Sequence, residues 1–280
     1  MTAPDLYSDV RAYDIAFADR DFVGDCDFLE YCLTEFGSVG ARTSGRLALP
    51  PRTQPPPAHP LSFLELAAGP ARHAREIARR GWRSVMLDLS PDMLNYAQAR
   101  AKGEGLEIEA ICADMTDFDL EEPVALAATL LESLAHLTTN EQVICHLRTV
   151  SRNLLPGGIF VIQMAHPQFI WRDSLPHCWT SKHDDGTEID VVFGSKDDPY
   201  DWITQQWTVT VRMDIREPGR PPRIVESHTN LRWYLAQELR ALIDSSQAFS
   251  RTLWFGNMVV PPPPLDCGPD SDEMIVVLRK

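Results

Sequence analysis

Three acidic residues of this chain, Glu65, Asp88 and Asp114, each stand at or just after the end of a short apolar segment. A turn of small residues, from Ala67 to Ala71, follows the first of them. A carboxylate beside such an open backbone turn suits a ligand that is cationic or rich in hydroxyl groups. If the apolar segments are neighbouring parallel strands, the three acids lie along one sheet edge, where ligands of open α/β sheets bind.

The apolar segments that carry these acids alternate with helical patterns. The expected strands of this alternating part are Leu61–Leu66, Ser84–Leu87, Ile108–Ala113, Val124–Leu131 and Ile159–Ala165. Ser90, Pro91 and Asp92 have the composition of a helix start, and residues 139–142 form a capping box. Such alternation predicts a parallel, right-handed, doubly wound sheet. Two further strands, at 250–255 and 273–278, have no helix between them, so the last strand of a seven-stranded, Rossmann-like sheet is expected to be antiparallel.

The rest of the chain is expected to add to this α/β sheet at both ends. We expect an N-terminal helical cap and a proline-rich connector in residues 1–60, followed by the Rossmann-like core in residues 61–166. An insertion is expected in residues 167–233. The helix and strands that complete the sheet are expected in residues 234–280. Within the insertion, residues 167–202 show no clear periodicity and are interpreted as a loop or lid. Apolar and polar residues alternate at 204–214 and again at 223–233, and a proline-containing turn joins the two segments. This pattern predicts an antiparallel hairpin.

The composition argues against several function classes. The chain has 280 residues and a net charge of -14, and such a charge repels nucleic-acid backbones, so no nucleic-acid partner is expected. The six cysteines contain no Cys-x-x-Cys pair, which argues against a metal site. The N-terminus lacks the pattern of a signal peptide, and no apolar run approaches the roughly 20 residues of a membrane span. We therefore expect a cytoplasmic protein without a membrane partner.

Together, these segments resemble the class I S-adenosylmethionine-dependent methyltransferases of small molecules. The matching residues are Glu65-Leu66-Ala67-Ala68-Gly69-Pro70-Ala71, Leu87-Asp88-Leu89-Ser90-Pro91-Asp92-Met93-Leu94, Ala113-Asp114-Met115 and Leu154-Leu155-Pro156-Gly157-Gly158. The resemblance covers residues 61–166 and 223–280. A nicotinamide-binding Rossmann domain is the nearest alternative, but it requires a third glycine where this chain has Arg72.

The resemblance implies that S-adenosylmethionine is the cofactor and that it lies along the acidic edge. It implies that Glu65 accepts a hydrogen bond from the ammonium group, directly or through water. It also implies that Asp88 accepts from the ribose hydroxyls and Asp114 from the adenine amino group. The other residues expected at the cofactor are Ala67, Gly69, Leu89, Met93, Met115 and Leu131, the last near the sulfonium.

The turn that follows Glu65 departs from the pattern of the family. The family usually has glycine at the positions of Ala67 and Ala71. Because alanine tolerates positive φ poorly, we expect both residues to have ordinary, negative φ.

The resemblance further implies a small-molecule acceptor, plausibly a specialised metabolite, bound with help from the 167–233 insertion. His166 and His136 follow expected strands and are the candidate bases; a structural role is the alternative for each. Tyr13, Trp171 and Trp179 are candidate substrate contacts, although the tryptophans equally suit the core of a small subdomain. Two other functions stay open: non-methyl chemistry with the same cofactor, such as cyclisation, and cofactor binding without catalysis. The sequence is also compatible with a homodimer.

Overall fold

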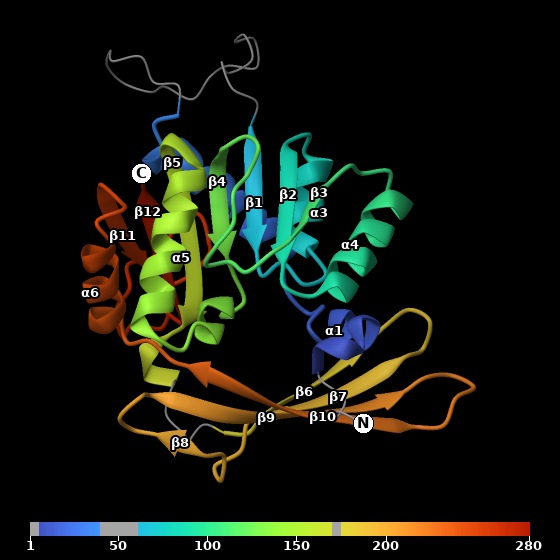
Figure 1. The fold of residues 1–280 in the computed structure, drawn as a ribbon. Helices are drawn as coiled ribbons and strands as arrows, with labels where there is room; N and C mark the ends of the chain where they lie inside the picture. Colours follow the sequence, from blue (N-terminus) through green and yellow to red (C-terminus); the bar gives the residue numbers. More distant parts are fainter. Residues whose placement is uncertain (1–5, 40–60, 170–174) are drawn as a thin grey trace.

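A computed structural model describes residues 6–39, 61–169 and 175–280. Two β-sheets make up the framework, and they lie one above the other in Figure 1. The larger sheet has seven strands, which lie across it in the order β11 (Arg251–Phe255), β12 (Glu273–Arg279), β5 (Leu154–Ala165), β4 (Val124–Thr129), β1 (Ser62–Leu66), β2 (Arg83–Asp88) and β3 (Glu109–Cys112). Strands β3, β2, β1, β4 and β5 are parallel, and β12 runs antiparallel to both β5 and β11. The predicted seven-stranded, doubly wound sheet with an antiparallel last strand is confirmed.

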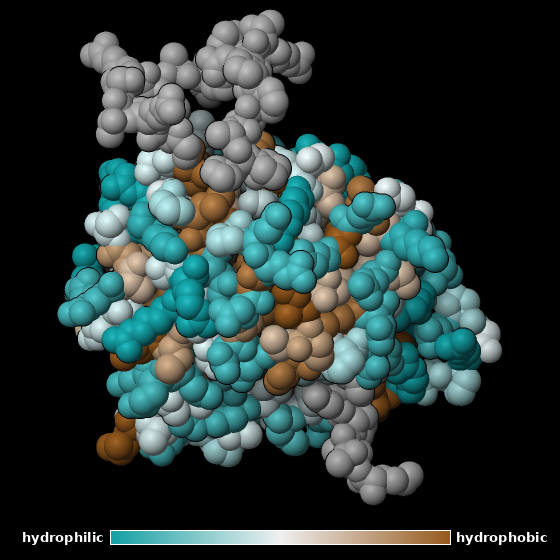
Figure 2. Space-filling view, turned by 45° about the horizontal axis from the view of Figure 1, so that its top comes forward, coloured by the Kyte–Doolittle hydropathy of each residue, from teal (hydrophilic) through white to brown (hydrophobic). Residues whose placement is uncertain are grey.

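Helices cover both faces of the large sheet. One face packs against α5 (Asn140–Asn153) and α6 (Ala236–Ser246), and the other against α2 (Phe22–Phe36), α3 (Arg72–Arg79) and α4 (Pro91–Gly103). Strands β1 and β4 are buried along their whole length, which is why β4 is apolar in every position except Thr129. On the face shown in Figure 2, hydrophilic residues cover most of the surface and hydrophobic residues lie in smaller groups between them.

Helix starts predicted from the sequence form as expected. The hydroxyl of Ser90 accepts from the backbone N–H of Met93 at 3.3 Å, with Pro91 as the first residue of α4. Thr139 and Gln142 form the predicted capping box of α5. These caps fix where α4 and α5 begin, and therefore where the loops after β2 and β4 end.

The smaller sheet corrects one prediction. Residues 177–201, expected to be a loop or lid, contain three of its strands, β6 (His177–Lys182), β7 (Glu188–Phe193) and β8 (Tyr200–Asp201). They pair with the predicted hairpin of β9 (Gln206–Arg216) and β10 (Arg223–Arg232), and all the pairings are antiparallel. Strand β6 is mostly exposed, so its sequence carries no alternating apolar pattern that would reveal it.

The helix α1 (Val10–Ala16) joins the two sheets. It lies between the smaller sheet and the lower edge of the larger one, beside α4 (Figure 1). The carbonyl oxygen of Ala16 accepts from the indole of Trp179 at 2.7 Å and from the hydroxyl of Ser181 at 2.9 Å. On its other side, the carboxylate of Asp14 accepts from Arg72 at 2.6 Å and from Tyr96 at 2.8 Å. The remaining helical segments are the short turns η1 (Leu6–Ser8), η2 (Ser133–His136) and η3 (Pro167–Phe169). The proline-rich connector predicted within residues 37–60 lies largely outside the described residues.

Candidate active site

A cavity of about 650 Å³ opens at the carboxyl edge of the large sheet. The sequence-predicted site residues that line it are Tyr13, Ala67, Gly69, Asp88, Leu89, Met93, Asp114, Met115 and His136. They come from the ends of β1, β2 and β3, from the start of α4, from η2, and from α1. The volume falls in the range of small-molecule sites in proteins. Asp88 and Asp114, two of the three acids predicted at this edge, therefore line the cavity.

The turn after β1 is strained. Ala67, Gly69 and Ala71 have φ values of 49°, 50° and 53°, so the expectation of ordinary φ at the two alanines is wrong. Their neighbours impose this conformation, because the turn must lead from β1 into α3 within a few residues while it stays close to β2. A side chain at Gly69 would point toward the ring of Tyr13, 3.7 Å from its Cε1 atom. The turn thus presents bare backbone to the cavity between β1 and α1.

Asp88 joins this turn to the next loop. One carboxylate oxygen accepts from the backbone N–H of Gly69 at 2.7 Å, and the other accepts from the backbone N–H of Ser90 at 2.8 Å. A carboxylate has about four acceptor positions, so both oxygens retain capacity for a ligand. Asp114 is similar, since its Oδ1 atom accepts from both the N–H and the hydroxyl of Thr116 while the residue remains exposed.

Glu65 lies elsewhere than predicted. It is buried and is absent from the cavity wall; one oxygen pairs with His73 Nδ1 at 2.8 Å and the other accepts from the N–H of Ala74 at 2.8 Å. Helix α3 has no side-chain cap at Ala71, so Glu65 supplies the negative charge that its N-terminus favours. Both carboxylate oxygens therefore have partners inside the protein, and the contact with a cofactor ammonium, directly or through water, stays a prediction.

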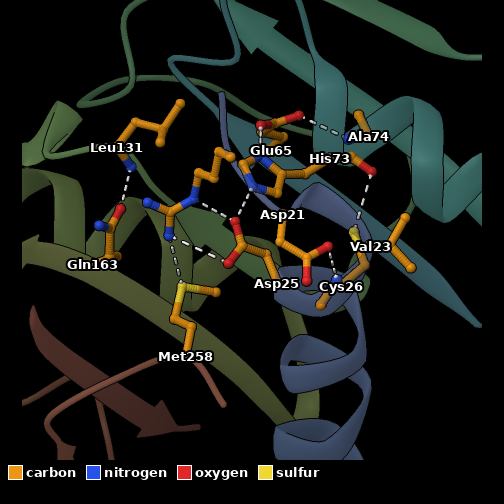
Figure 3. Close-up of polar contacts among 12 residues, drawn as sticks. Asp21, Val23, Asp25, Cys26, Glu65, His73, Ala74, Leu131, Gln163 and Met258 are labelled. Carbon is orange, nitrogen blue, oxygen red and sulfur yellow. Dashed lines mark hydrogen bonds and ion pairs between the residues drawn. The ribbon is translucent and has the colours of Figure 1, made fainter. Parts of the chain in front are cut away.

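A chain of buried charges continues from Glu65 (Figure 3). His73 also bonds through Nε2 to Asp25 at 3.1 Å, and Asp25 pairs with Arg20. Burial by itself lowers the pKa of His73, but its two carboxylate neighbours outweigh burial and raise that pKa. Both ring nitrogens donate to carboxylates only when the ring is protonated, so His73 is held as an imidazolium. Sequence analysis missed this residue, because a histidine inside a helix carries no signal for partners on other elements.

His166 is a structural residue and not the expected base. It is buried, its Nε2 atom donates to the carbonyl of Asp266 at 2.9 Å, and its Nδ1 atom accepts from the N–H of Gln168 at 3.2 Å. With both nitrogens occupied, the ring has no lone pair available for a substrate proton. Trp179 and Leu131 also lie outside the cavity wall, and Trp171 lies outside the described residues.

His136 does face the cavity. It lies on η2, and its Nε2 atom is 3.1 Å from the hydroxyl of Tyr7, which also lines the cavity. Tyr7 contacts Tyr13 with ring centroids 5.5 Å apart, so α1 and η2 close one side of the cavity with aromatic rings. Burial, followed by the charges of Asp88 and Asp14, raises the pKa of Tyr13, which stays neutral.

Comparisons with known proteins agree with this geometry. Residues 63–158 match a family described as "Methyltransferase domain". The structural neighbours of the chain include S-adenosylmethionine-dependent methyltransferases, and they share its Rossmann-like fold.

Three of the similar proteins are informative. The dTDP-3-amino-3,4,6-trideoxy-alpha-D-glucopyranose N,N-dimethyltransferase of Streptomyces venezuelae is 28% identical over 102 residues, which are 36% of this chain and 41% of that protein. The crystal structure of an S-adenosylmethionine-dependent methyltransferase from Clostridium acetobutylicum has a TM-score of 0.71 at 14% identity and covers 96% of both chains. The structure of Streptomyces venezuelae DesVI has a TM-score of 0.69 at 17% identity, with the same coverage. The chain thus spans less than half of that curated relative, and the solved structures share its fold.

Within the described residues, no helix has the length and apolar character needed to cross a membrane.

Proposed function

We propose that this protein is an S-adenosylmethionine-dependent methyltransferase that acts on a small molecule. The observation that carries the proposal is the convergence of Gly69, Asp88 and Asp114 on one cavity within the methyltransferase domain. Strain in the turn beside them supports it, since backbone strain of this kind concentrates at ligand sites.

The residues of the cavity fit the cofactor. The bare turn at Gly69 leaves a narrow space under Tyr13 for the amino-acid end, because a Cβ atom there would fill part of it. Asp88 has acceptor capacity for the ribose hydroxyls, and Asp114 has it for the adenine amino group, with Met115, Leu89 and Met93 lining the same wall. When bound, S-adenosylmethionine supplies an activated methyl group on a sulfonium. The protein contributes orientation and exclusion of water.

We further propose that the acceptor is an amine on a sugar. Support comes from the relatives, of which one is named as an N,N-dimethyltransferase of a dTDP-amino sugar. Support also comes from the cavity wall beyond the nucleoside residues, where Tyr7, Ser133 and His136 offer polar groups to a hydroxylated acceptor. His136 and Tyr13 are proposed to contact that acceptor, and Leu131, at the end of β4, to lie near the methyl donor.

The test is methyl transfer to dTDP-3-amino-3,4,6-trideoxy-α-D-glucopyranose, followed by mass spectrometry. The expected products are its mono- and dimethylated forms. The matched control is the same nucleotide sugar with a hydroxyl in place of the amine, which should stay unmodified. Methylation of neither compound, or of both equally, would contradict the amine as acceptor. Calorimetry with S-adenosylhomocysteine tests cofactor binding separately.

The proposed cellular setting is the cytoplasm. All six cysteines lie in the described residues and are free thiols, which suits a reducing compartment. A homodimer stays a prediction, and the size of the protein in solution would test it.

A further inference from the structure

Glu132 lies between β4 and η2, next in sequence to Ser133, which lines the cavity, although Glu132 itself is not among the lining residues. It follows Leu131 directly after β4, and both residues have positive φ, 53° and 59°. Glu132 is half-buried, and among the described residues no hydrogen bond or ion pair joins its carboxylate to another group. A half-buried carboxylate has lost part of its hydration, so a ligand with an N–H donor or a positive charge would stabilise it.

The surroundings of Glu132 favour a cation. The charged groups that act on it are Glu273, at the start of β12, and Arg20, between α1 and α2. Glu273 accepts from Arg20 through Oε1, but its Oε2 atom is buried and has no hydrogen-bond partner. Burial, with a further contribution from Glu273, raises the pKa of Glu132 to about 7, although Arg20 opposes this. Arg20 bonds to Asp25 and Glu273 and not to Glu132, and one buried oxygen of Glu273 is left without a partner.

The strand order places Glu132 on the acceptor side of the sheet. Asp88 and Asp114, the proposed nucleoside ligands, follow β2 and β3 on one side of β1, whereas Glu132 follows β4 on the other side. The next residues along the chain, Ser133 and His136 on η2, line the cavity. Glu132 is thus adjacent to the cavity at the end opposite to the adenine residues.

A hydrogen-bonded chain holds the strained turn of Leu131 and Glu132 in place, and Figure 3 shows its first bond, between Leu131 and Gln163. The side-chain oxygen of Gln163 on β5 accepts from the backbone N–H of Leu131. The amide nitrogen of Gln163 donates to Glu273 at 2.8 Å, and Glu273 connects through Arg20 to Asp25. The position of Glu132 is therefore set by β5 and β12 as well as by its own strand.

We propose that Glu132 is a catalytic residue that contacts the amine of the acceptor and takes its proton. This inference rests on the proposed function, because it requires an amine acceptor. An amine that enters as an ammonium ion transfers one N–H proton to the carboxylate of Glu132, and the electron pair of that bond stays on nitrogen. That pair forms the new N–C bond while the C–S bond of the methyl donor breaks, and its electrons remain on sulfur as S-adenosylhomocysteine leaves.

The first test compares Glu132→Gln with wild type on dTDP-3-amino-3,4,6-trideoxy-α-D-glucopyranose. The change keeps the size of the side chain but removes its basicity, so kcat should fall by about 100-fold or more. Affinity for S-adenosylhomocysteine and the thermal midpoint should stay close to those of wild type. Glu121→Gln, at an exposed residue before β4, is the matched control and should retain wild-type kcat. An unchanged kcat in Glu132→Gln would overturn the inference while leaving the proposed function intact.

The second test follows the protonation of Glu132. In wild type, kcat should rise as the pH increases through about 7, because only the carboxylate accepts a proton. Glu273→Gln removes a neighbouring negative charge, so this rise should move to lower pH. Carbon NMR of labelled glutamate, assigned with Glu132→Gln, should show the same shift without any turnover. If Glu132 titrates near its ordinary value of 4.5 in wild type, the inference fails. If wild type methylates neither the amino sugar nor its hydroxyl analogue, the proposed function fails, and this inference fails with it.

Discussion

Backbone strain at single residues marks the place where the two halves of the large sheet diverge. Within residues 6–39, 61–169 and 175–280, six non-glycine residues have positive φ, and four of them are Ala67, Ala71, Leu131 and Glu132. These four residues follow β1 and β4, which are neighbours in the sheet. After β1 the chain continues to α3 on one face of the sheet, and after β4 it continues to α5 on the other face. Ligands of open α/β sheets bind at such a point. The strain is therefore concentrated where the methyl donor and the acceptor are proposed to meet.

One consequence concerns stability at Ala71. An L-residue in the left-handed region costs about 1–2 kcal/mol relative to glycine, and glycine loses about 0.4–1 kcal/mol through the greater freedom of the unfolded chain. Ala71→Gly should therefore stabilise the protein by roughly 0.5–1 kcal/mol. Urea unfolding at equilibrium measures this change. The methyl group of Ala71 is fully buried. A loss of stability in the variant would mean that the packing of this methyl group stabilises the protein by more than its backbone strain destabilises it.

A second residue-scale prediction concerns Asp88. Asp88→Asn removes the negative charge but keeps one oxygen to accept from Gly69 or Ser90. Affinity for S-adenosylhomocysteine should fall by about 1.5–3 kcal/mol, as charged hydrogen bonds are lost. Calorimetry measures this, with the exposed Asp119→Asn as control. Equal affinities in the two variants would remove Asp88 from the cofactor site.

At the scale of elements, α1 closes the cavity and depends on one buried charge. Asp14 is buried, and it binds Arg72 of α3 and Tyr96 of α4. Asp14→Ala leaves the guanidinium without this partner and should cost about 2 kcal/mol. Because Tyr7 and Tyr13 are carried by the same segment, affinity for S-adenosylhomocysteine should also fall.

Hydrogen exchange distinguishes local from global effects of Asp14→Ala. Faster exchange confined to α1, with α5 unchanged, is the expected result. Asp19→Ala, at an exposed residue after α1, serves as control and should exchange like wild type. Exchange that accelerates equally in both helices would show that α1 does not open as a separate unit.

At the scale of the whole molecule, two buried histidines make stability depend on pH in opposite directions. Burial lowers the pKa of His146 from 6.5 to about 4, so its neutral form stabilises the fold above 6.5, and this contribution is lost as the pH falls toward 4. The pKa of His73 is raised, so its contribution is complete below the ordinary value of 6.5 and is lost as the pH rises through the folded-state pKa.

The variant His146→Gln isolates the contribution of His146 to the pH dependence of stability. Its glutamine can still donate to the carbonyl of Met115, which His146 contacts through Nδ1 at 2.8 Å. Between pH 6.5 and 4, wild type should lose about 3 kcal/mol more stability than the variant. Denaturant titrations across this range measure the difference. Parallel losses in the two proteins would show that His146 does not titrate on unfolding.

The sequence by itself determined the large sheet and its nucleoside edge. Apolar strands that alternate with capped helices permit few topologies, and acids at strand ends must then share one edge, so Asp88 and Asp114 could be placed from spacing alone. Local patterns carry this information because each strand and each cap is specified by neighbouring residues.

Only the tertiary structure decided the rest. Three features depend on residues far away in sequence. They are the positive φ of Ala67 and Ala71, the internal partners of Glu65 and His166, and the strands at residues 177–201. Glu132 was not distinguished from any other acid after a strand until Gln163 and Glu273 were found beside it. The physical reason is that desolvation and hydrogen-bond partners are properties of the folded surroundings, which no local spacing records.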